Sequence, residues 1–331
     1  MKYSVIIPVY NRPDEVKELL ENLAAQTHKD FEVLVVEDGS SLSCKDVVAA
    51  ANVMGGMDLH YYVKENSGPG RSRNYGAAKA HGEYLVFLDS DCVLPPGYIE
   101  ALDAALATEQ ADAFGGPDRA HVAFTPMQKA INYAMTSFFT TGGIRGGRKK
   151  LDKFYPRSFN MGMRREVFER LGGFSEMRFG EDIDLSIRLF AGGFKCCLFP
   201  NAWVWHKRRT DLKKFFKQVH NSGIARINLW KRHPGSLKLV HLLPAMFVGG
   251  ETVLLLGLSV CRWAVLPLVV YALLVLADAS LKEKSLKVGL LAVAASFVQL
   301  TGYGTGFMRA LWRRCVCGKG EFEAFKENFY K

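Results

Sequence analysis

The apolar residues of this chain are distributed unevenly, and the distribution changes near Leu237. Before this residue, apolar and polar residues alternate with the periods of strands and helices. After it, the apolar residues form three long runs, at about 239–260, 263–279 and 288–312. A helix needs about 20 apolar residues to span a bilayer. The sequence therefore predicts a soluble domain followed by transmembrane or membrane-associated helices over 237–312.

The number of spans is left open, because length and charge disagree. The first and third runs are long enough for spanning helices, whereas the second is marginal. Basic clusters flank the third run, with Lys282, Lys284 and Lys287 before it and Arg309, Arg313 and Arg314 at its end. Both clusters have the character of cytoplasmic flanks, which three full spans would not allow. Two spans with a re-entrant or interfacial segment would remove the conflict.

The formal net charge is +10, and basic residues are concentrated just before the first apolar run. An apolar stripe opposite lysines over 211–236 is typical of an amphipathic linker helix in the membrane interface, although packing on the soluble domain would also explain it. No nucleic-acid-binding motif accompanies the basic cluster. We therefore expect anionic lipids, and no nucleic acid, as its partner. Residues 313–331 form a basic tail.

The seven cysteines form an odd set without the paired spacing of a disulfide framework. Such a set favours a reducing compartment. Together with the basic flanks of the apolar runs, it predicts a protein of the cell inner membrane whose soluble domain lies on the cytoplasmic side.

The first 210 residues alternate predicted strands with predicted helices. Buried strands are expected at 3–8, 31–36 and 84–88, with amphipathic helices between them. This alternation predicts an α/β domain with a mostly parallel sheet and helices on both faces. Ligands bind beyond the carboxyl ends of the strands in such sheets. We therefore expect the site where two of these strands end, at Glu37-Asp38 and Asp89-Ser90-Asp91.

The acidic triplet at the end of the third strand has a spacing that suits a metal. Asp89 and Asp91 are at positions i and i+2, so their side chains project to the same side as the chain leaves the strand. Two carboxylates can bind a hard divalent cation, such as Mg²⁺ or Mn²⁺, together with a diphosphate. A polar cap on the strand is the alternative explanation, and the triplet alone does not decide between them.

Six motifs occur in one order over about residues 1–210. They are Pro8-Val9-Tyr10-Asn11, Glu37-Asp38-Gly39-Ser40, Gly70-Arg71-Ser72-Arg73-Asn74, Phe87-Leu88-Asp89-Ser90-Asp91, Asn160-Met161-Gly162 with Gly172-Gly173-Phe174, and Glu181-Asp182-Ile183-Asp184. In order and rough spacing they resemble the family 2 inverting glycosyltransferases, and their joint occurrence is specific although no single motif is. The resemblance implies the nucleotide-diphospho-sugar transferase fold called GT-A, a hexosyltransferase type of activity, and Mn²⁺ or Mg²⁺ as cofactor.

The resemblance also implies roles for individual residues. Its nucleotide-sugar-binding positions are Pro8, Tyr10, Asn11, Asp38, Arg73 and Asp89. Tyr10 would offer an aromatic face to the base, and Asp38 would accept a hydrogen bond from uracil or guanine, which suits a UDP- or GDP-linked donor. Asp91 would bind the metal. His206 matches a position where related enzymes place a histidine near metal or diphosphate, with a purely structural histidine as the alternative.

Glu181 and Asp182 match the catalytic pair of the family, in which the aspartate is the base. Inverting transfer needs a base to take the proton of the acceptor hydroxyl while the diphosphate leaves from the opposite face. Acids at a helix start are also favoured by the helix dipole alone. The pair favours a hydroxyl acceptor on a lipid-linked or other membrane-associated glycan in cell-surface polysaccharide assembly. A polyprenyl-phosphate sugar synthase is the alternative, although its phosphate acceptor needs no base.

Other classes of protein fit the sequence less well. A sugar-phosphate nucleotidyltransferase would need a glycine-rich loop near the first strand, and the segment 8–12 has no glycine. A membrane scaffold without enzymatic activity would not need the nucleotide and metal motifs. Substrate specificity is expected in the less periodic stretch 114–157.

Overall fold

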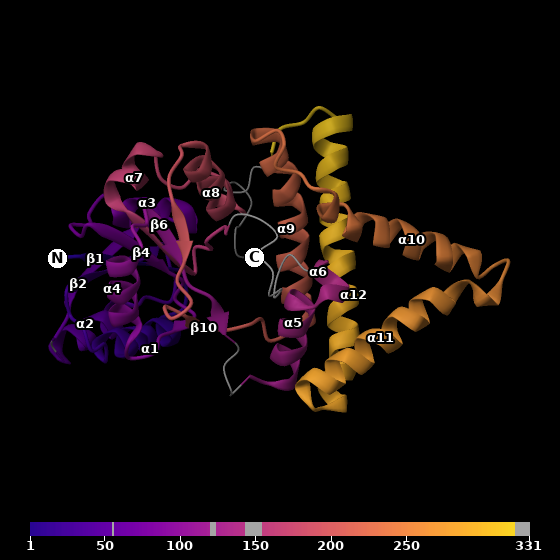
Figure 1. Ribbon diagram of the computed structural model, residues 1–331, viewed down its shortest axis with the longest axis horizontal. Helices are drawn as coiled ribbons and strands as arrows, with labels where there is room; N and C mark the ends of the chain where they lie inside the picture. The colour runs from indigo at the N-terminus through magenta and orange to yellow at the C-terminus, as the bar shows by residue number, and fades with distance from the viewer. Residues whose placement is uncertain (55, 120–123, 143–153, 322–331) are drawn as a thin grey trace. The chain divides into compact units, whose positions relative to one another are not determined.

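The structure is a computed structural model that describes residues 1–54, 56–119, 124–142 and 154–321 (Figure 1). The chain divides into two compact units. Within the described residues, unit 1 comprises 1–119 and 154–207, and unit 2 comprises 124–142 and 208–321. The segment 124–142 thus belongs with the C-terminal helices, although unit 1 precedes and follows it in the chain.

Unit 1 contains a central sheet that has seven strands within the described residues. In spatial order they are β3 (Asp58–Lys64), β2 (Phe31–Asp38), β1 (Tyr3–Val9), β4 (Tyr84–Leu88), β8 (Asn160–Arg164), β6 (Ala113–Gly115) and β9 (Cys196–Leu198). The first four are parallel, β8 is antiparallel to β4 and β6, and β9 is parallel to β6. The sheet is therefore mostly parallel, as the sequence predicted.

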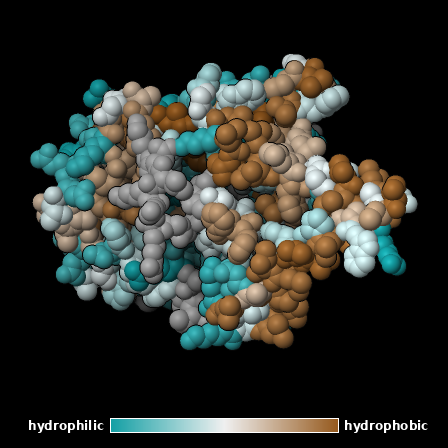
Figure 2. Space-filling model, turned by 45° about the vertical axis from the view of Figure 1, so that its right-hand side comes forward, coloured by the Kyte–Doolittle hydropathy of each residue, from teal (hydrophilic) through white to brown (hydrophobic). Residues whose placement is uncertain are grey.

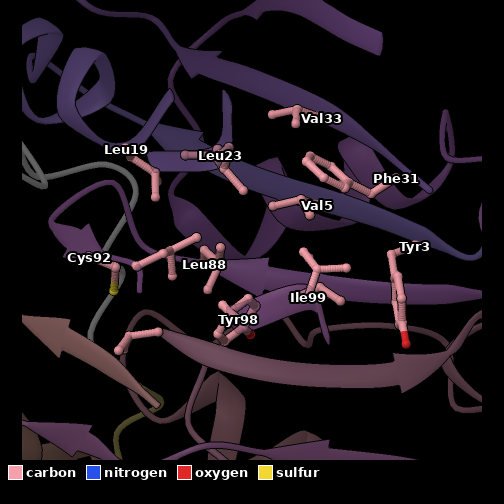
Figure 3. Close-up of a cluster of buried hydrophobic side chains, with 14 of the residues drawn as sticks. Tyr3, Val5, Leu19, Leu23, Phe31, Val33, Leu88, Cys92, Tyr98 and Ile99 are labelled. Atoms are coloured by element: carbon pink, nitrogen blue, oxygen red, sulfur yellow. The ribbon is translucent and has the colours of Figure 1, made fainter. Parts of the chain in front are cut away.

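Helices cover both faces of this sheet. They are α1 (Pro13–Ala24), α2 (Lys45–Met54), α3 (Pro69–Ala77), α4 (Tyr98–Thr108), α7 (Arg165–Arg170) and α8 (Glu181–Ala191). Alternate residues of β1 face opposite sides, so Val5 and Ile7 pack with α1, α2 and α4, while Ile6 packs with α3, α7 and α8. Figure 3 shows the first of these clusters, with Leu19 and Leu23 of α1 over the strands. The predicted arrangement of helices on both faces is confirmed.

Strand β8 is not among the strands expected from the sequence. Asparagine and glycine are depleted in strands, and β8 begins with Asn160-Met161-Gly162. The glycine is required by packing, because a Cβ atom at Gly162 would lie 2.0 Å from the ring of Phe114 on the neighbouring strand. A close approach between strands therefore explains a residue that local propensity disfavours.

Unit 2 is helical in its described part. Its helices are α5 (Pro126–Thr136), α6 (Phe138–Thr141), α9 (Leu212–Arg232), α10 (Leu243–Gly257), α11 (Leu266–Glu283) and α12 (Leu286–Leu311), with short 3₁₀ turns at Leu239–His241 and Arg262–Val265 and a π-helical turn at Trp312–Val316. Helix α12 contacts α5, α9, α10 and α11. Figure 1 shows α10 and α11 as a hairpin beside α12.

Helix α9 carries the amphipathic stripe, and the stripe packs against α12. Phe215 and Val219 are buried in a cluster that includes α12 side chains. The two backbones approach closely, because a Cβ atom at Gly223 of α9 would lie 2.1 Å from the carbonyl oxygen of Tyr303, and one at Gly306 of α12 would lie 2.0 Å from that of His220. Small residues permit such contact between helices. The stripe therefore serves packing within unit 2, and an interfacial position of α9 stays a prediction.

Two helical segments are long and apolar enough to cross a membrane, Arg262–Glu283 and Leu286–Val316. This corrects the expectation for the first apolar run, whose helix α10 has only 15 residues, and for the second run, whose helix is longer than the run itself. Large apolar side chains are exposed on both α10 and α11, among them Leu256 and Leu273. Figure 2 shows apolar surface on the side of the molecule that carries these helices.

Candidate active site

Polar residues of unit 1 gather where β1, β2 and β4 end. In the sheet register, Val9 of β1 lies beside Glu37 of β2, and β4 ends one residue before Asp89. Because these strands are parallel, their carboxyl ends meet at one edge of the sheet, which is the expected position of a ligand.

Asp38, at the end of β2, is 1 % exposed and organises the turn after β3. Its carboxylate accepts hydrogen bonds from the backbone N–H groups of Ser67 and Gly68, at 2.9 and 2.8 Å. It also forms an ion pair with Lys64, a residue that the sequence analysis did not single out. A carboxylate can accept about four hydrogen bonds, so the contact with a base stays a prediction.

Asn11 ties the loop after β1 to the loop after β2. Its Oδ1 accepts from the N–H groups of Ser41 and Leu42, at 2.7 and 2.9 Å, and its own N–H donates to Ser40 Oγ at 3.0 Å. Its φ of +54° lies in the left-handed region, which asparagine tolerates better than most residues. Pro8 and Tyr10 are half-buried in the same segment. The structure thus gives Asn11 a loop-positioning role beside its predicted role in binding.

Arg73 joins three of the sequence motifs. Its guanidinium is 3 % exposed and donates to Asp89 Oδ1 at 2.6 Å and to Glu181 Oε1 at 3.1 Å. The ring of Phe174 lies 5.4 Å from its Cζ. Helix α3, the end of β4 and the start of α8 are therefore held together by one buried cation.

Glu181 and Asp182 are the first residues of α8, directly after Gly180, whose φ is +84°. Burial and, to a smaller extent, the charge of Asp182 raise the pKa of Glu181 to about 7, and Arg73 opposes them. Asp182 is 4 % exposed. Its Oδ2 pairs with Arg157 Nε at 2.7 Å, and its Oδ1 accepts from the N–H of Ile183 at 2.8 Å. The predicted base is therefore already paired with a cation.

Asp91 and His206 are brought together by a small second sheet. Within the described residues it consists of β5 (Cys92–Val93), β10 (Val204–His206) and β7 (Asp118–Arg119). His206 lies opposite Cys92 in the antiparallel register, and its Nε2 is 3.2 Å from Asp91 Oδ1. Phe159 stacks on the imidazole, with ring centroids 4.7 Å apart. Two residues far apart in the sequence thus lie side by side, and their role as metal ligands stays a prediction.

The other oxygen of Asp91 is held by Arg12, whose Nη1 lies 2.7 Å from Oδ2. Burial disfavours the charged form of Asp91, but His206 and Arg12 outweigh it and hold the pKa of this carboxyl well below its usual range. Asp91 is therefore a carboxylate at any physiological pH. Arg12 and Arg157 were not predicted, since Arg12 follows the Pro8–Asn11 motif without belonging to it and Arg157 lies in the stretch without a pattern.

The donors around Asp91 fit a divalent cation. Two ligands of an octahedral ion at about 2.1 Å are about 3.0 Å apart, close to the 3.2 Å between Asp91 Oδ1 and His206 Nε2. His206 Nδ1 is buried and has no hydrogen-bond partner among the described residues. Cys92 Sγ is also near, but burial and the charge of Asp91 raise the pKa of this thiol well above its usual value, so it stays protonated and ligates poorly.

A protein-family model described as glycosyl transferase family 2 matches residues 4–172, which is more than half of the chain. The chain belongs to glycosyl transferase family 2. The mannosyltransferase PcManGT of Pyrobaculum calidifontis, solved in complex with GDP-Man and Mn²⁺, has a similar structure, with a TM-score of 0.64 and 19 % identity over 90 % of this chain and 87 % of that one. This likeness, with the sheet described above, confirms the predicted GT-A fold.

The matches to curated relatives cover only part of the length of each relative. An uncharacterized glycosyltransferase of Rickettsia felis is 42 % identical over 90 residues, which are 27 % of this chain and 15 % of the relative. One of a Nostoc species is 28 % identical over 231 residues, or 67 % of this chain and 66 % of the relative. The chain thus spans less than two thirds of each of these two relatives.

Proposed function

We propose that this family 2 member is a membrane-anchored, inverting, metal-dependent glycosyltransferase. It moves a sugar from a UDP- or GDP-linked donor to a hydroxyl of a membrane-associated, lipid-linked glycan in cell-surface polysaccharide assembly. The observation that carries the proposal is the arrangement at the carboxyl edge of the sheet, where Arg73 joins Asp89 to Glu181 and the next carboxylate, Asp91, faces His206.

The donor binds along this edge. Pro8 and Tyr10 line the pocket for the base, and Asp38 accepts a hydrogen bond from it. Asp91 and His206 would hold Mn²⁺ or Mg²⁺, and Asp89 would contribute to binding the nucleotide sugar. When bound, the cation supplies charge stabilisation for the departing diphosphate.

The chain's own cations support the same step. Arg12 lies 2.7 Å from Asp91 and places a second positive charge where the diphosphate binds. Negative charge that develops on the leaving group is stabilised by fixed cations in a partly buried site. Arg73 keeps the neighbouring carboxylates in place and prevents their mutual repulsion from opening the site.

Asp182 is the base for the acceptor hydroxyl. Its Oδ2 pairs with Arg157 Nε at 2.7 Å, and a carboxylate placed beside the acceptor hydroxyl can take its proton. Arg157 is 39 % exposed at its side chain, so it can move to solvent when the acceptor hydroxyl takes its place. Glu181, held by Arg73, orients the start of α8.

The helices of unit 2 support membrane attachment. The segments Arg262–Glu283 and Leu286–Val316 meet the length and hydropathy of spanning helices. Anchoring would keep the enzyme beside a lipid-linked acceptor, with unit 1 on the cytoplasmic side of the inner membrane where nucleotide sugars are made. A polyprenyl phosphate is the alternative acceptor and is distinguished by the product.

The proposal is tested with the full chain purified in detergent. It is incubated with UDP- and GDP-sugars and Mn²⁺ or Mg²⁺, first alone and then with membrane lipid extract, and release of nucleoside diphosphate is measured. We expect release from one donor, abolished by chelator and by Asp91→Ala. If the sugar is transferred to a polyprenyl phosphate that carried no sugar before, the acceptor is the phosphate and not a hydroxyl. Absence of release with every donor and extract would contradict the proposal.

A further inference from the structure

A second group of metal-ligating side chains lies at the opposite edge of the central sheet. Glu32 is the second residue of β2, Asp58 is the first residue of β3, and the two are paired in the register. His60 follows on β3, and His81 lies in the connection between α3 and β4. Glu32 and Asp38 are six residue steps apart on β2, which corresponds to about 20 Å along the strand. The group is therefore separate from the candidate active site.

Glu32 is held so that one of its oxygens faces the two imidazoles. Its side chain is fully buried, and its Oε1 accepts from Ser4 Oγ and from the N–H of His81, both at 2.6 Å. Its Oε2 lies 3.2 Å from His81 Nδ1 and 3.6 Å from His60 Nε2. Ser4 and the backbone thus fix the carboxylate, and the free oxygen is directed at nitrogen donors.

Asp58 completes the group from the solvent side. Its Oδ1 lies 3.0 Å from His60 Nε2, and Glu32, Asp58 and His60 each offer a donor atom within 4.8 Å of the other two. The side chains of His60, Asp58 and His81 are 37 %, 51 % and 76 % exposed. Asp58 and His60 are therefore accessible to an ion from solvent, and the buried carboxylate of Glu32 lies directly behind them.

The spacing of three of these donors suits a transition-metal ion. Ligand atoms about 2.0–2.1 Å from zinc are about 3.3 Å from one another in a tetrahedron. The separations from His60 Nε2 to Asp58 Oδ1 and to Glu32 Oε2, 3.0 and 3.6 Å, lie on both sides of this value. His81 contacts Glu32 but is not among the three residues whose donor atoms lie within 4.8 Å of one another. An imidazole nitrogen with two carboxylate oxygens is a donor set that Zn²⁺ accepts, with a position left for water.

We propose that Glu32, Asp58 and His60 form a structural site for a divalent transition metal of the Zn²⁺ type, with His81 holding the Glu32 carboxylate. The ion ties the edge strand β3 to β2. Strand β3 ends in Lys64, which pairs with Asp38 in the candidate active site, so a metal at one end of the strand stabilises the position of a cation at the other. The site does not depend on the proposed glycosyl transfer.

The test uses the full chain in detergent, stripped with chelator, and measures Zn²⁺ binding by titration calorimetry and thermal melting. Asp91→Ala is the background for all variants, because it removes the candidate active-site ligand. We expect one Zn²⁺ equivalent in this background, with a rise in Tm. His60→Ala with His81→Ala should abolish both that equivalent and the rise.

His28→Ala is the matched control, since His28 is a half-exposed histidine of unit 1 that pairs with the single carboxylate Asp103. It should leave the equivalent and the rise in Tm unchanged. Glu32 is not substituted, because Ser4 and the connection before β4 depend on it. Circular dichroism confirms that each apo variant is folded. If the Asp91→Ala chain binds no Zn²⁺, or if the double histidine variant still binds the same equivalent, the proposal is wrong.

Discussion

Replacing Arg73 by methionine should destabilise the fold strongly and in a pH-dependent way. The guanidinium is 3 % exposed and lies within hydrogen-bond distance of Asp89 and Glu181. Removing one partner of a buried ion pair costs about 3–5 kcal/mol, because the other charge is left without compensation. Glu181 carries most of this cost, since its side chain is 10 % exposed whereas that of Asp89 is 31 % exposed.

The pH dependence of the cost follows from Glu181. Its pKa is already raised to about 7 by burial, and loss of Arg73 would raise it further. Stability falls by about 1.4 kcal/mol per pH unit while the folded carboxyl stays protonated and the unfolded one is ionised. The stability of wild type stops falling above pH 7, because Glu181 is then ionised in the folded state, whereas the stability of Arg73→Met continues to fall. The loss of stability caused by Arg73→Met should therefore be about 1.4 kcal/mol larger at pH 8 than at pH 6.

Guanidinium-induced unfolding of the full chain in detergent, followed by tryptophan fluorescence, measures this cost. Arg71→Met is the control, because Arg71 forms its ion pair with Glu176 at the surface, with side chains 46 % and 74 % exposed. An exposed pair of this kind contributes about 1 kcal/mol or less. Adding Glu181→Gln to Arg73→Met should recover part of the loss. If Arg73→Met costs no more than Arg71→Met at pH 8, the account of this cluster is wrong.

Three further predictions concern the metal ligand, the acid pair and the membrane. In the absence of the sugar donor, Arg12→Ala should raise the affinity for Mn²⁺ by up to about tenfold, because the substitution frees an oxygen of Asp91 from a charge-assisted hydrogen bond. EPR measures free Mn²⁺ in a titration, and a level equal to that of wild type would contradict this prediction. Glu181 has a raised pKa, so its contribution to folding stability is present below its usual pKa and is lost as pH rises to about 7; Glu181→Gln should remove this part of the pH profile, and an unaltered profile would refute it. Cys261 and Cys315 are exposed free cysteines; Cys261 directly precedes the first candidate span, and Cys315 lies at the end of the second. An impermeant thiol reagent should label both from the cytoplasmic side. Labelling from opposite sides would exclude a pair of spans.

The α/β fold could be predicted because its signals are local. Alternate residues of β1 contribute apolar side chains to the cores on the two faces of the sheet. A short stretch of sequence is therefore enough to show that both faces are buried. The carboxylates at strand ends are also local, since a strand that ends in Asp89-Ser90-Asp91 presents both acids wherever it is placed. These two kinds of pattern were sufficient to predict the edge at which the structure gathers the candidate site residues.

The remaining features depend on partners far apart in the sequence. Arg12 contacts Asp91, and Arg157 contacts Asp182, but no spacing relates either arginine to its carboxylate. The apolar stripe of α9 could be read from the sequence, but a stripe does not identify the element against which it packs. Helix α12 is that element, because Gly302 and Gly306 allow the close approach of the two helices. Helix α10 is shorter than its apolar run because the helix ends at Gly257, before a turn of apolar residues that hydropathy alone does not separate from it.

Donor binding tests the central claim most directly, because the claim is that Asp91 and His206 hold a cation and a nucleotide sugar together. Calorimetric titration of the full chain with the donor that supports turnover, with and without Mn²⁺, measures this coupling. We expect binding that requires Mn²⁺ in wild type and is lost in both Asp91→Asn and His206→Ala. Equal donor affinity with and without Mn²⁺, or binding unaffected by both substitutions, would contradict the account.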